Sequence, residues 1–384
     1  MLDIKYRTIL SVAIPLMGTS FIQSIVMITD SAFLSRYSIT AFDAAGNGGL
    51  IYITVFIALM GMSDGAQIIM ARRIGEKKEN LIAQVFGTTL ITNFLISLLL
   101  FCAIYLFIPD LINGITKHHD IAKGEIDFIQ IRSYGLFFSM ISLTIYAYFI
   151  AQGKTYVVFL SAVAIALANL TLDYALIFGN LGFPSLGLQG AALASTISDG
   201  LGMLLALAIL TFGNSRKHHK IFSEIKFNLE SIRRLVGVGG PIMLQGLVAL
   251  ITWTAFFVWI EQMGKYELTI SQNIRSLYFI AFVPIWGFAG TTKTYISQYT
   301  GLNAYTKIKI VQRRILLLTF VFLILLFHGA ILYPKHLVEL INPNTEYIQA
   351  SAEILRFIFG SILIYGLGNV FFQTINGGGN TKFT

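Results

Sequence analysis

The chain has 384 residues, of which 55% are hydrophobic and only 12% are charged, and its formal net charge is +8. A soluble domain of this length could not bury so much apolar surface, so the composition indicates a polytopic membrane protein in a lipid bilayer. The basic residues lie between apolar runs, and we therefore attribute the positive charge to membrane topology and expect no nucleic acid as a partner. The one cysteine, Cys102, lies inside an apolar run, which excludes a disulfide framework and a thiolate metal site.

Ten apolar segments are each long enough to cross a bilayer of roughly 30 Å as a helix. In chain order they cover residues 8–36, 44–72, 81–108, 126–150, 155–179, 188–213, 235–261, 268–298, 310–333 and 351–376. Lys and Arg are concentrated in alternate loops on the side of the N-terminus, which favours a cytoplasmic N-terminus. The polar stretch 214–234 is then a cytoplasmic linker.

Residues 1 to about 155 recur 226 positions later, with one local slip near Pro109 and Pro334. An even number of helices in each copy gives both copies the same orientation in the membrane. The repeat therefore predicts an all-α bundle of two lobes, an N-terminal lobe 1–213 with six helices and a C-terminal lobe 235–384 with four. The pairs at this offset include Pro15 with Pro241, Asn47 with Asn273, Tyr52 with Tyr278, Phe56 with Phe282, Gly61 with Gly287 and Gly75 with Gly301.

The second copy is shorter than the first, because Thr384 corresponds to Val158, where the fifth helix begins. By the symmetry of the repeat, a complete chain would have about 440 residues and twelve helices. We therefore expect this sequence to hold ten helices of twelve and to be a fragment without transport activity of its own.

Four acidic residues lie well inside predicted spans, and all four belong to the first copy: Asp30, Asp64, Asp173 and Asp199. An ionisable side chain in the hydrocarbon region costs a few kcal/mol and by default marks a transport pathway or relay. Asp30 and Asp173 each lie six residues before the outer end of a span, about 9 Å below the surface.

Other polar side chains are predicted in the same layer. Asn169 precedes Asp173 by four residues, so both share one helix face, and Ser195 and Thr196 of the sixth span lie at the same depth. Two carboxylates, an amide and a hydroxyl can bind a hard monovalent cation, and they can equally carry protons. The alternative is that these groups only hydrogen-bond one another across helices.

The remaining charged residues lie outside this layer. Asp64 lies near Arg72 and Arg73, and we expect it to be solvated or paired. Asp199 is deeper and receives no role. Arg132 is counted among the outer loops and helix ends. Lys293 is expected to snorkel toward the interface.

Several segments resemble the multidrug and toxic compound extrusion (MATE) family. In chain order they are IPLMGTSFIQSIVMITDSAFLSR, GMSDGAQIIMARRIGE, AQGKTYVVFLSAVAIALANLTLDYALIFG, GLQGAALAST and NGGGNT. The first contains Pro15, Gln23 and Asp30 placed as in that family, and the third contains its Asn-x-x-x-Asp pattern at Asn169 and Asp173. The order and spacing of these segments carry the resemblance across essentially the whole chain.

The resemblance implies a twelve-helix, two-lobed antiporter, not an enzyme, that expels organic cations by alternating access in exchange for Na⁺ or H⁺. It assigns the cation-coupling role to Asp30, Asn169, Asp173 and Ser195, and places Na⁺ at the first three. It implies no cofactor beyond the coupling ion and a monomer in the cytoplasmic (inner) membrane of a bacterium. Some members also use an acidic residue in helix 7, whereas residues 241–260 here contain none, which argues against a second-lobe cation site.

Two other classes of protein are alternatives for a polytopic chain of this composition. A flippase for a lipid-linked oligosaccharide, from the same broader superfamily, should have a strongly cationic central cavity, whereas the deep charges of the first copy are acidic. A polytopic membrane enzyme should carry a catalytic cluster, and no Ser/His/Asp or Cys/His grouping is evident.

Overall fold

The computed structural model describes residues 1–115, 119–213 and 219–384, and these residues form helices joined by short connections, without strands. The first copy contains α1 (Tyr6–Tyr37), α2 (Ile39–Gly75), α3 (Ile82–Ile115), α4 (His119–Ser133), α5 (Gly135–Ala151), α6 (Tyr156–Phe178) and α7 (Gly187–Phe212). The second contains α9 (Leu229–Met263), α10 (Lys265–Gly301), α11 (Tyr305–Phe327), α12 (Gly329–Leu332), α13 (Pro334–Ile341) and α14 (Thr345–Gly377). Two short 3₁₀ turns are η1 (Glu79–Leu81) and η2 (Ile221–Glu224).

In the described residues, nine helices are long and apolar enough to cross a membrane, or ten if the bent pair α4 and α5 forms one span. This agrees with the ten predicted spans. The predicted span 126–150 is bent by 44° between α4 and α5, where Gly135 weakens helix continuity. Residues 214–218 of the predicted linker lie outside the described residues, and α9 already begins at Leu229.

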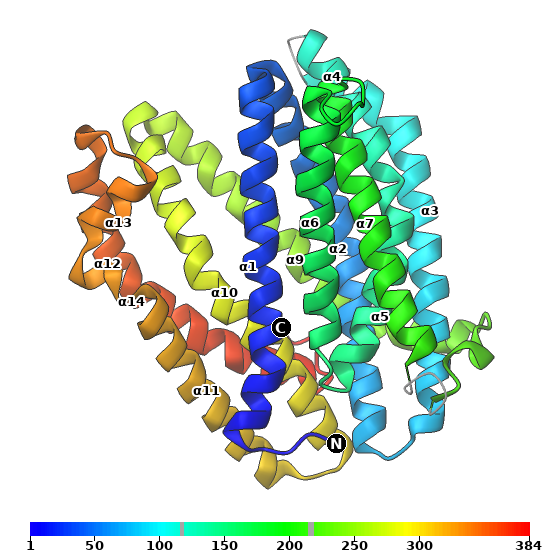
Figure 1. Cartoon of the computed structure of the whole chain (residues 1–384). Coiled ribbons are helices and arrows are strands. Elements are labelled where there is room, and N and C mark those ends of the chain that lie inside the picture. The colour runs from blue at the N-terminus through cyan, green and yellow to red at the C-terminus, as the bar shows by residue number, and fades with distance from the viewer. Residues whose placement is uncertain (116–118, 214–218) are drawn as a thin grey trace.

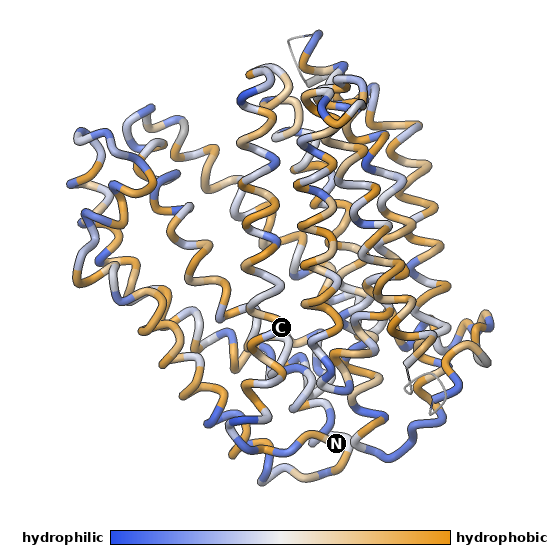
Figure 2. The backbone as a smooth tube through the Cα atoms, viewed as in Figure 1, coloured by the Kyte–Doolittle hydropathy of each residue, from blue (hydrophilic) through white to orange (hydrophobic). Residues whose placement is uncertain are grey.

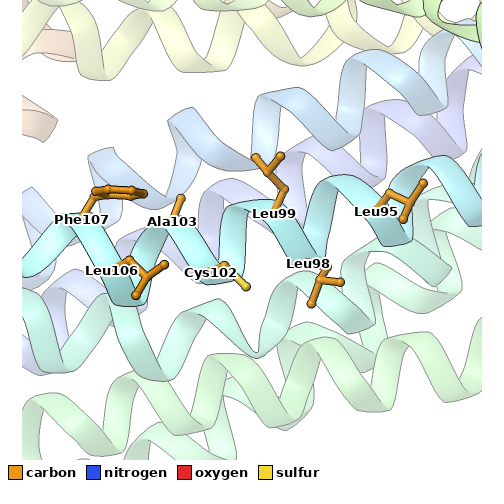
Figure 3. Close-up of a pocket in the computed structure, with 7 residues that line it drawn as sticks. All are labelled: Leu95, Leu98, Leu99, Cys102, Ala103, Leu106 and Phe107. Atoms are coloured by element: carbon orange, nitrogen blue, oxygen red, sulfur yellow. The ribbon is translucent and has the colours of Figure 1, made fainter.

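Hydrophobic residues dominate the lengths of the helices, whereas hydrophilic residues gather in the loops at both ends of the bundle (Figure 2). A shallow apolar hollow follows the exposed face of α3, and all of its lining residues belong to that helix (Figure 3). Cys102 lies in this hollow and is exposed. An exposed apolar face on one helix is typical of a surface that contacts lipid.

The two copies form two lobes that approach each other near the N-terminus and diverge toward the opposite end (Figure 1). Equivalent residues of the two lobes make equivalent close contacts across the interface between the lobes. A side chain added at Gly61 of α2 would collide with Met243 of α9, and one added at Gly287 of α10 would collide with Met17 of α1. Met17 and Met243 are equivalent at the offset of 226, as are Gly61 and Gly287. The contact is therefore made twice, as expected for a pseudo-twofold axis.

A second symmetric contact closes the end of the bundle near the N-terminus. The last residue of α2, Gly75, packs against the backbone of Gln298, and the last residue of α10, Gly301, packs against the backbone of Arg72. Arg72 and Gln298 are again equivalent positions. Glycine is required here because two helix backbones meet without room for a Cβ atom.

The chain start crosses from the first lobe to the second. Residues 2–4 precede α1, yet their backbone carbonyls accept hydrogen bonds from α10 and α11. The donors are the Tyr299 hydroxyl to Leu2 at 2.8 Å, the Tyr295 hydroxyl to Asp3 at 2.9 Å and the Arg314 guanidinium to Ile4 at 2.6 Å. The first residues of the chain are thereby fastened to the lobe to which α1 does not belong.

Candidate functional site

The polar layer predicted from the sequence lies inside the first lobe, between α1, α6 and α7. Asn169 and Asp173 are one turn apart on α6, and their exposed fractions are 1% and 0%. The Asn169 amide donates a hydrogen bond to Ser195 Oγ of α7 at 3.3 Å. Asp30 of α1 lies close enough to Asp173 for the two carboxyl groups to interact electrostatically. The structure thus brings all four predicted residues together.

Local sequence explains why α6 and α7 approach closely at this depth. Gly179 ends α6 in a left-handed conformation with φ of +76°, which glycine adopts without strain. Gly190 of α7 then lies against the Leu176 carbonyl, and a Cβ atom at Gly190 would come within 2.5 Å of that oxygen. The missing side chain lets α7 place Ser195 beside Asn169.

Several buried oxygen atoms in this cluster lack a hydrogen-bond partner among the described residues. They are Oδ1 of Asp30, Oδ1 of Asn169 and both carboxylate oxygens of Asp173. Buried polar atoms are normally hydrogen-bonded, and an unpaired buried carboxylate is costly. The site therefore offers four acceptors that a proton or a small cation would satisfy.

The donor set consists of two carboxyl groups, one amide oxygen and one hydroxyl, all of them oxygen ligands. Hard cations such as Na⁺ suit such ligands. The described part of the chain contains no group of three or more His, Cys, Asp or Glu residues placed to hold a metal ion. The geometry fits a single monovalent cation or protons better than a transition metal.

A second buried cluster adjoins this site, and the sequence did not reveal it. Arg132 of α4 forms an ion pair with Asp199 of α7, with Nη1 at 3.0 Å from Oδ2. The guanidinium also lies 4.3 Å from the ring centroid of Tyr52 on α2. The carbonyl of Ile131, the residue before Arg132, accepts a hydrogen bond at 3.4 Å from Thr196, the residue after Ser195, so the two clusters adjoin. Arg132 is therefore part of the interior of the lobe, and its predicted place among the outer loops and helix ends is wrong.

The misplacement of Arg132 has a simple geometric cause. The predicted span begins at residue 126, whereas α4 begins at His119. Seven additional helical residues place Arg132 about 10 Å further from the helix start. Counted from the true start of α4, Arg132 lies at about the same depth as Asp199 on α7. This comparison would have identified the pair.

Lys293 and Asp64 also differ from their interpretation. Lys293 Nζ lies 2.5 Å from Asp64 Oδ2, and only 9% of the lysine side chain is exposed. The prediction that Lys293 snorkels is wrong. Asp64 is paired, as expected, but its partner comes from the other lobe rather than from Arg72 or Arg73.

Two parallel copies of one helical unit, joined near one end and carrying buried carboxyl groups inside one copy, define a two-lobed membrane transporter. The MatE family model matches residues 15–175 and 241–384, one segment in each lobe. The chain belongs to this family, the MATE multidrug efflux transporters.

Individual proteins show the same relationship. The chain is 23% identical over 400 residues to the probable multidrug resistance protein NorM of Thermotoga maritima, covering 98% of this chain and 80% of that protein. It is 20% identical over 383 residues to the probable multidrug resistance protein YoeA of Bacillus subtilis, covering 97% and 81%. A crystal structure of a MATE protein in the straight conformation shares the fold with a TM-score of 0.90 at 18% identity, covering 98% of this chain and 83% of that one.

Proposed function

We propose that this protein is a secondary active antiporter that exports organic cations in exchange for Na⁺ or H⁺. The observation that carries the proposal is the group of buried, unpartnered oxygens on Asp30, Asn169 and Asp173 inside a transporter of the MATE family. The names of the relatives, probable multidrug resistance proteins, support export of small molecules. Asp30, Asn169, Asp173 and Ser195 form the coupling site in this proposal, and a coupling Na⁺ would contact the first three.

The proposed mechanism is alternating access between two lobes, 1–213 and 235–384, joined by the cytoplasmic linker 214–234. With the N-terminus in the cytoplasm of a bacterium and the chain in its inner membrane, the end where the lobes diverge faces outward (Figure 1). The symmetric glycine contacts close the cytoplasmic side. This arrangement corresponds to an outward-open state of a monomeric transporter.

Coupling requires that the cation bind one state more tightly than the other. Asp30 lies on α1, whereas Asp173 and Asn169 lie on α6. A shift of α1 against α6 would separate the carboxyl groups and release the cation. The bound cation therefore favours the state in which α1 and α6 hold all four oxygens together.

The flippase alternative is not favoured. The deep charges of the first lobe include the carboxyls of Asp30, Asp173 and Asp199, and the guanidinium of Arg132 beside them already pairs with Asp199. A cavity for an anionic lipid-linked oligosaccharide would need the opposite balance of charge.

The test is dye efflux from vesicles that contain the full-length protein, under an imposed Na⁺ or H⁺ gradient. Asp30→Asn should abolish gradient-driven efflux while expression is unchanged. Asp43→Asn is the matched control, because Asp43 is an exposed carboxyl on α2 outside the cluster. Efflux by Asp30→Asn at the wild-type rate under both gradients would contradict the assignment of the site.

A further inference from the structure

The ion pair of Arg132 and Asp199 lies beside the coupling site but contributes no oxygen to it. It is partly buried, since the side chains of Arg132 and Asp199 are 13% and 23% exposed. Three surfaces define the position of the guanidinium. They are the Asp199 carboxylate, the face of the Tyr52 ring and the backbone at Gly135, where an added Cβ would lie 3.6 Å from Arg132 Nη1.

The position of Arg132 matters because an arginine is itself a cation. A guanidinium is permanently charged and binds carboxylates in a two-pronged geometry. The backbone carbonyl of Ile131, the residue before Arg132, accepts a hydrogen bond at 3.4 Å from Oγ1 of Thr196, the residue after Ser195, so Arg132 lies next to the layer of the coupling site. Without a nearer carboxylate, this long side chain would be drawn to the unpartnered oxygens of the Asp30–Asp173 pair. It would then occupy the place of the coupling ion as a tethered competitor.

We propose that Asp199 is a positioning residue that holds Arg132 away from Asp30 and Asp173 and so keeps these carboxyls open to the coupling cation. The proposal rests on the proposed function, because it assumes that a cation binds at Asp30 and Asp173. Asp199 acts through Arg132 and does not contact the ion. Tyr52 supports the same position of the guanidinium through its ring.

A purely structural ion pair would behave differently. Removing one partner of a buried pair leaves an uncompensated charge and destabilises the protein, whereas removing both is often tolerated. Such a role predicts changes in the amount of folded protein but none in the affinity for the coupling cation. A positioning role predicts a loss of cation affinity that disappears when the arginine charge is also removed.

The experiment measures the cation concentration that gives half-maximal dye efflux, together with the maximal rate, for the full-length protein and its variants in vesicles. Na⁺ and pH are titrated separately. Asp199→Asn should raise the half-maximal concentration about 10-fold or more, within the range of ordinary coupling between sites, with little loss of maximal rate at saturating cation. Asp199→Asn combined with Arg132→Gln should return it to within about 3-fold of wild type.

A second comparison covers the case in which Asp199→Asn alone does not fold. Asp199→Asn with Arg132→Lys and Asp199→Asn with Arg132→Gln both lack the carboxylate and differ in charge at position 132. The lysine variant should show the weaker cation affinity. Equal affinities in the two double variants, or an unchanged affinity in a folded Asp199→Asn, would overturn the proposal. Loss of efflux in Asp30→Asn together with either result would reject the role of Asp199 and leave the proposed function intact.

Discussion

Lys293 of α10 and Asp64 of α2 form an ion pair at 2.5 Å that joins the two lobes on the side of the N-terminus. At the repeat offset of 226, the position equivalent to Lys293 is Gln67, and the position equivalent to Asp64 is Gly290. Gln67 Nε2 donates a hydrogen bond to the Gly290 carbonyl at 3.1 Å, which crosses the same interface in the opposite direction. The repeat therefore preserves the geometry of the contact, whereas only one half of it carries charge.

Removing this charge should weaken the contact between the lobes on the side of the N-terminus. Lys293→Gln gives both lobes the same side chain and leaves Asp64 without its cation. It should therefore shift the population away from the state in which the lobes meet on the side of the N-terminus. Spin labels at Lys78 and Tyr305, both exposed, in a Cys102→Ala background would report the distance between the lobes by pulsed EPR. The label distance should lengthen in Lys293→Gln.

The matched control exchanges the charges. Asp64→Lys with Lys293→Asp should restore the wild-type distance, because the attraction between the two positions is independent of its direction. An identical distance distribution in wild type and Lys293→Gln would show that the ion pair does not contribute to closure.

The glycines that end α2 and α10 should tolerate no side chain. In Gly75→Ala the new Cβ would collide with the Gln298 carbonyl group, so the lobes would have to separate at that end. We expect transport to fall about 10-fold or more, since crowding of packed backbone costs about 1–3 kcal/mol. Gly49→Ala on the same helix is the control, because nothing lies within 4 Å of a Cβ there, and it should be neutral or stabilising by about 1 kcal/mol.

The other members of the proposed coupling site should contribute less than Asp30. Asp173→Asn and Asn169→Ala should each raise the cation concentration needed for half-maximal efflux about 10-fold, because each removes or weakens one oxygen ligand. Ser195→Thr should retain activity, since the hydroxyl is kept. Wild-type cation dependence in both Asp173→Asn and Asn169→Ala would show that α6 supplies no ligand.

Bound Na⁺ should also stabilise the folded protein. A ligand at 100 times its dissociation constant adds about 2.7 kcal/mol to the free energy of unfolding. Replacing choline chloride with NaCl at constant ionic strength should therefore raise the unfolding temperature of wild type but not of Asp30→Asn. Equal unfolding temperatures in the two salts would indicate protons rather than Na⁺ at the site.

The sequence predicted the parts of this structure that follow from periodicity. The repeat at offset 226, the ten spans and the meeting of Asp30, Asn169, Asp173 and Ser195 in one layer all depend on helix geometry within a lobe. The ion pair of Lys293 with Asp64 could not be predicted in this way, because it depends on how the lobes face each other.

The pair of Arg132 with Asp199 was missed for a different reason. Its recognition required the true start of α4, and helix ends in polar segments such as 119–125 carry little hydropathy signal. Errors of a few residues in a helix boundary become errors of about 10 Å in depth.

Because residues 2–4 are attached to α10 and α11, one end of α1 is fixed to the second lobe and the other end is further from that attachment. Its first residues are fixed to the second lobe, and Ile9, Val12, Ala13 and Met17 pack against α10 of that lobe, while the helix also packs along α6 of the first lobe. Rotation of the lobes relative to each other must therefore tilt α1, and the displacement grows with distance from the fixed end. Asp30 lies near the far end of α1, so a small angular change between the lobes is converted into the largest movement of the carboxyl that faces Asp173.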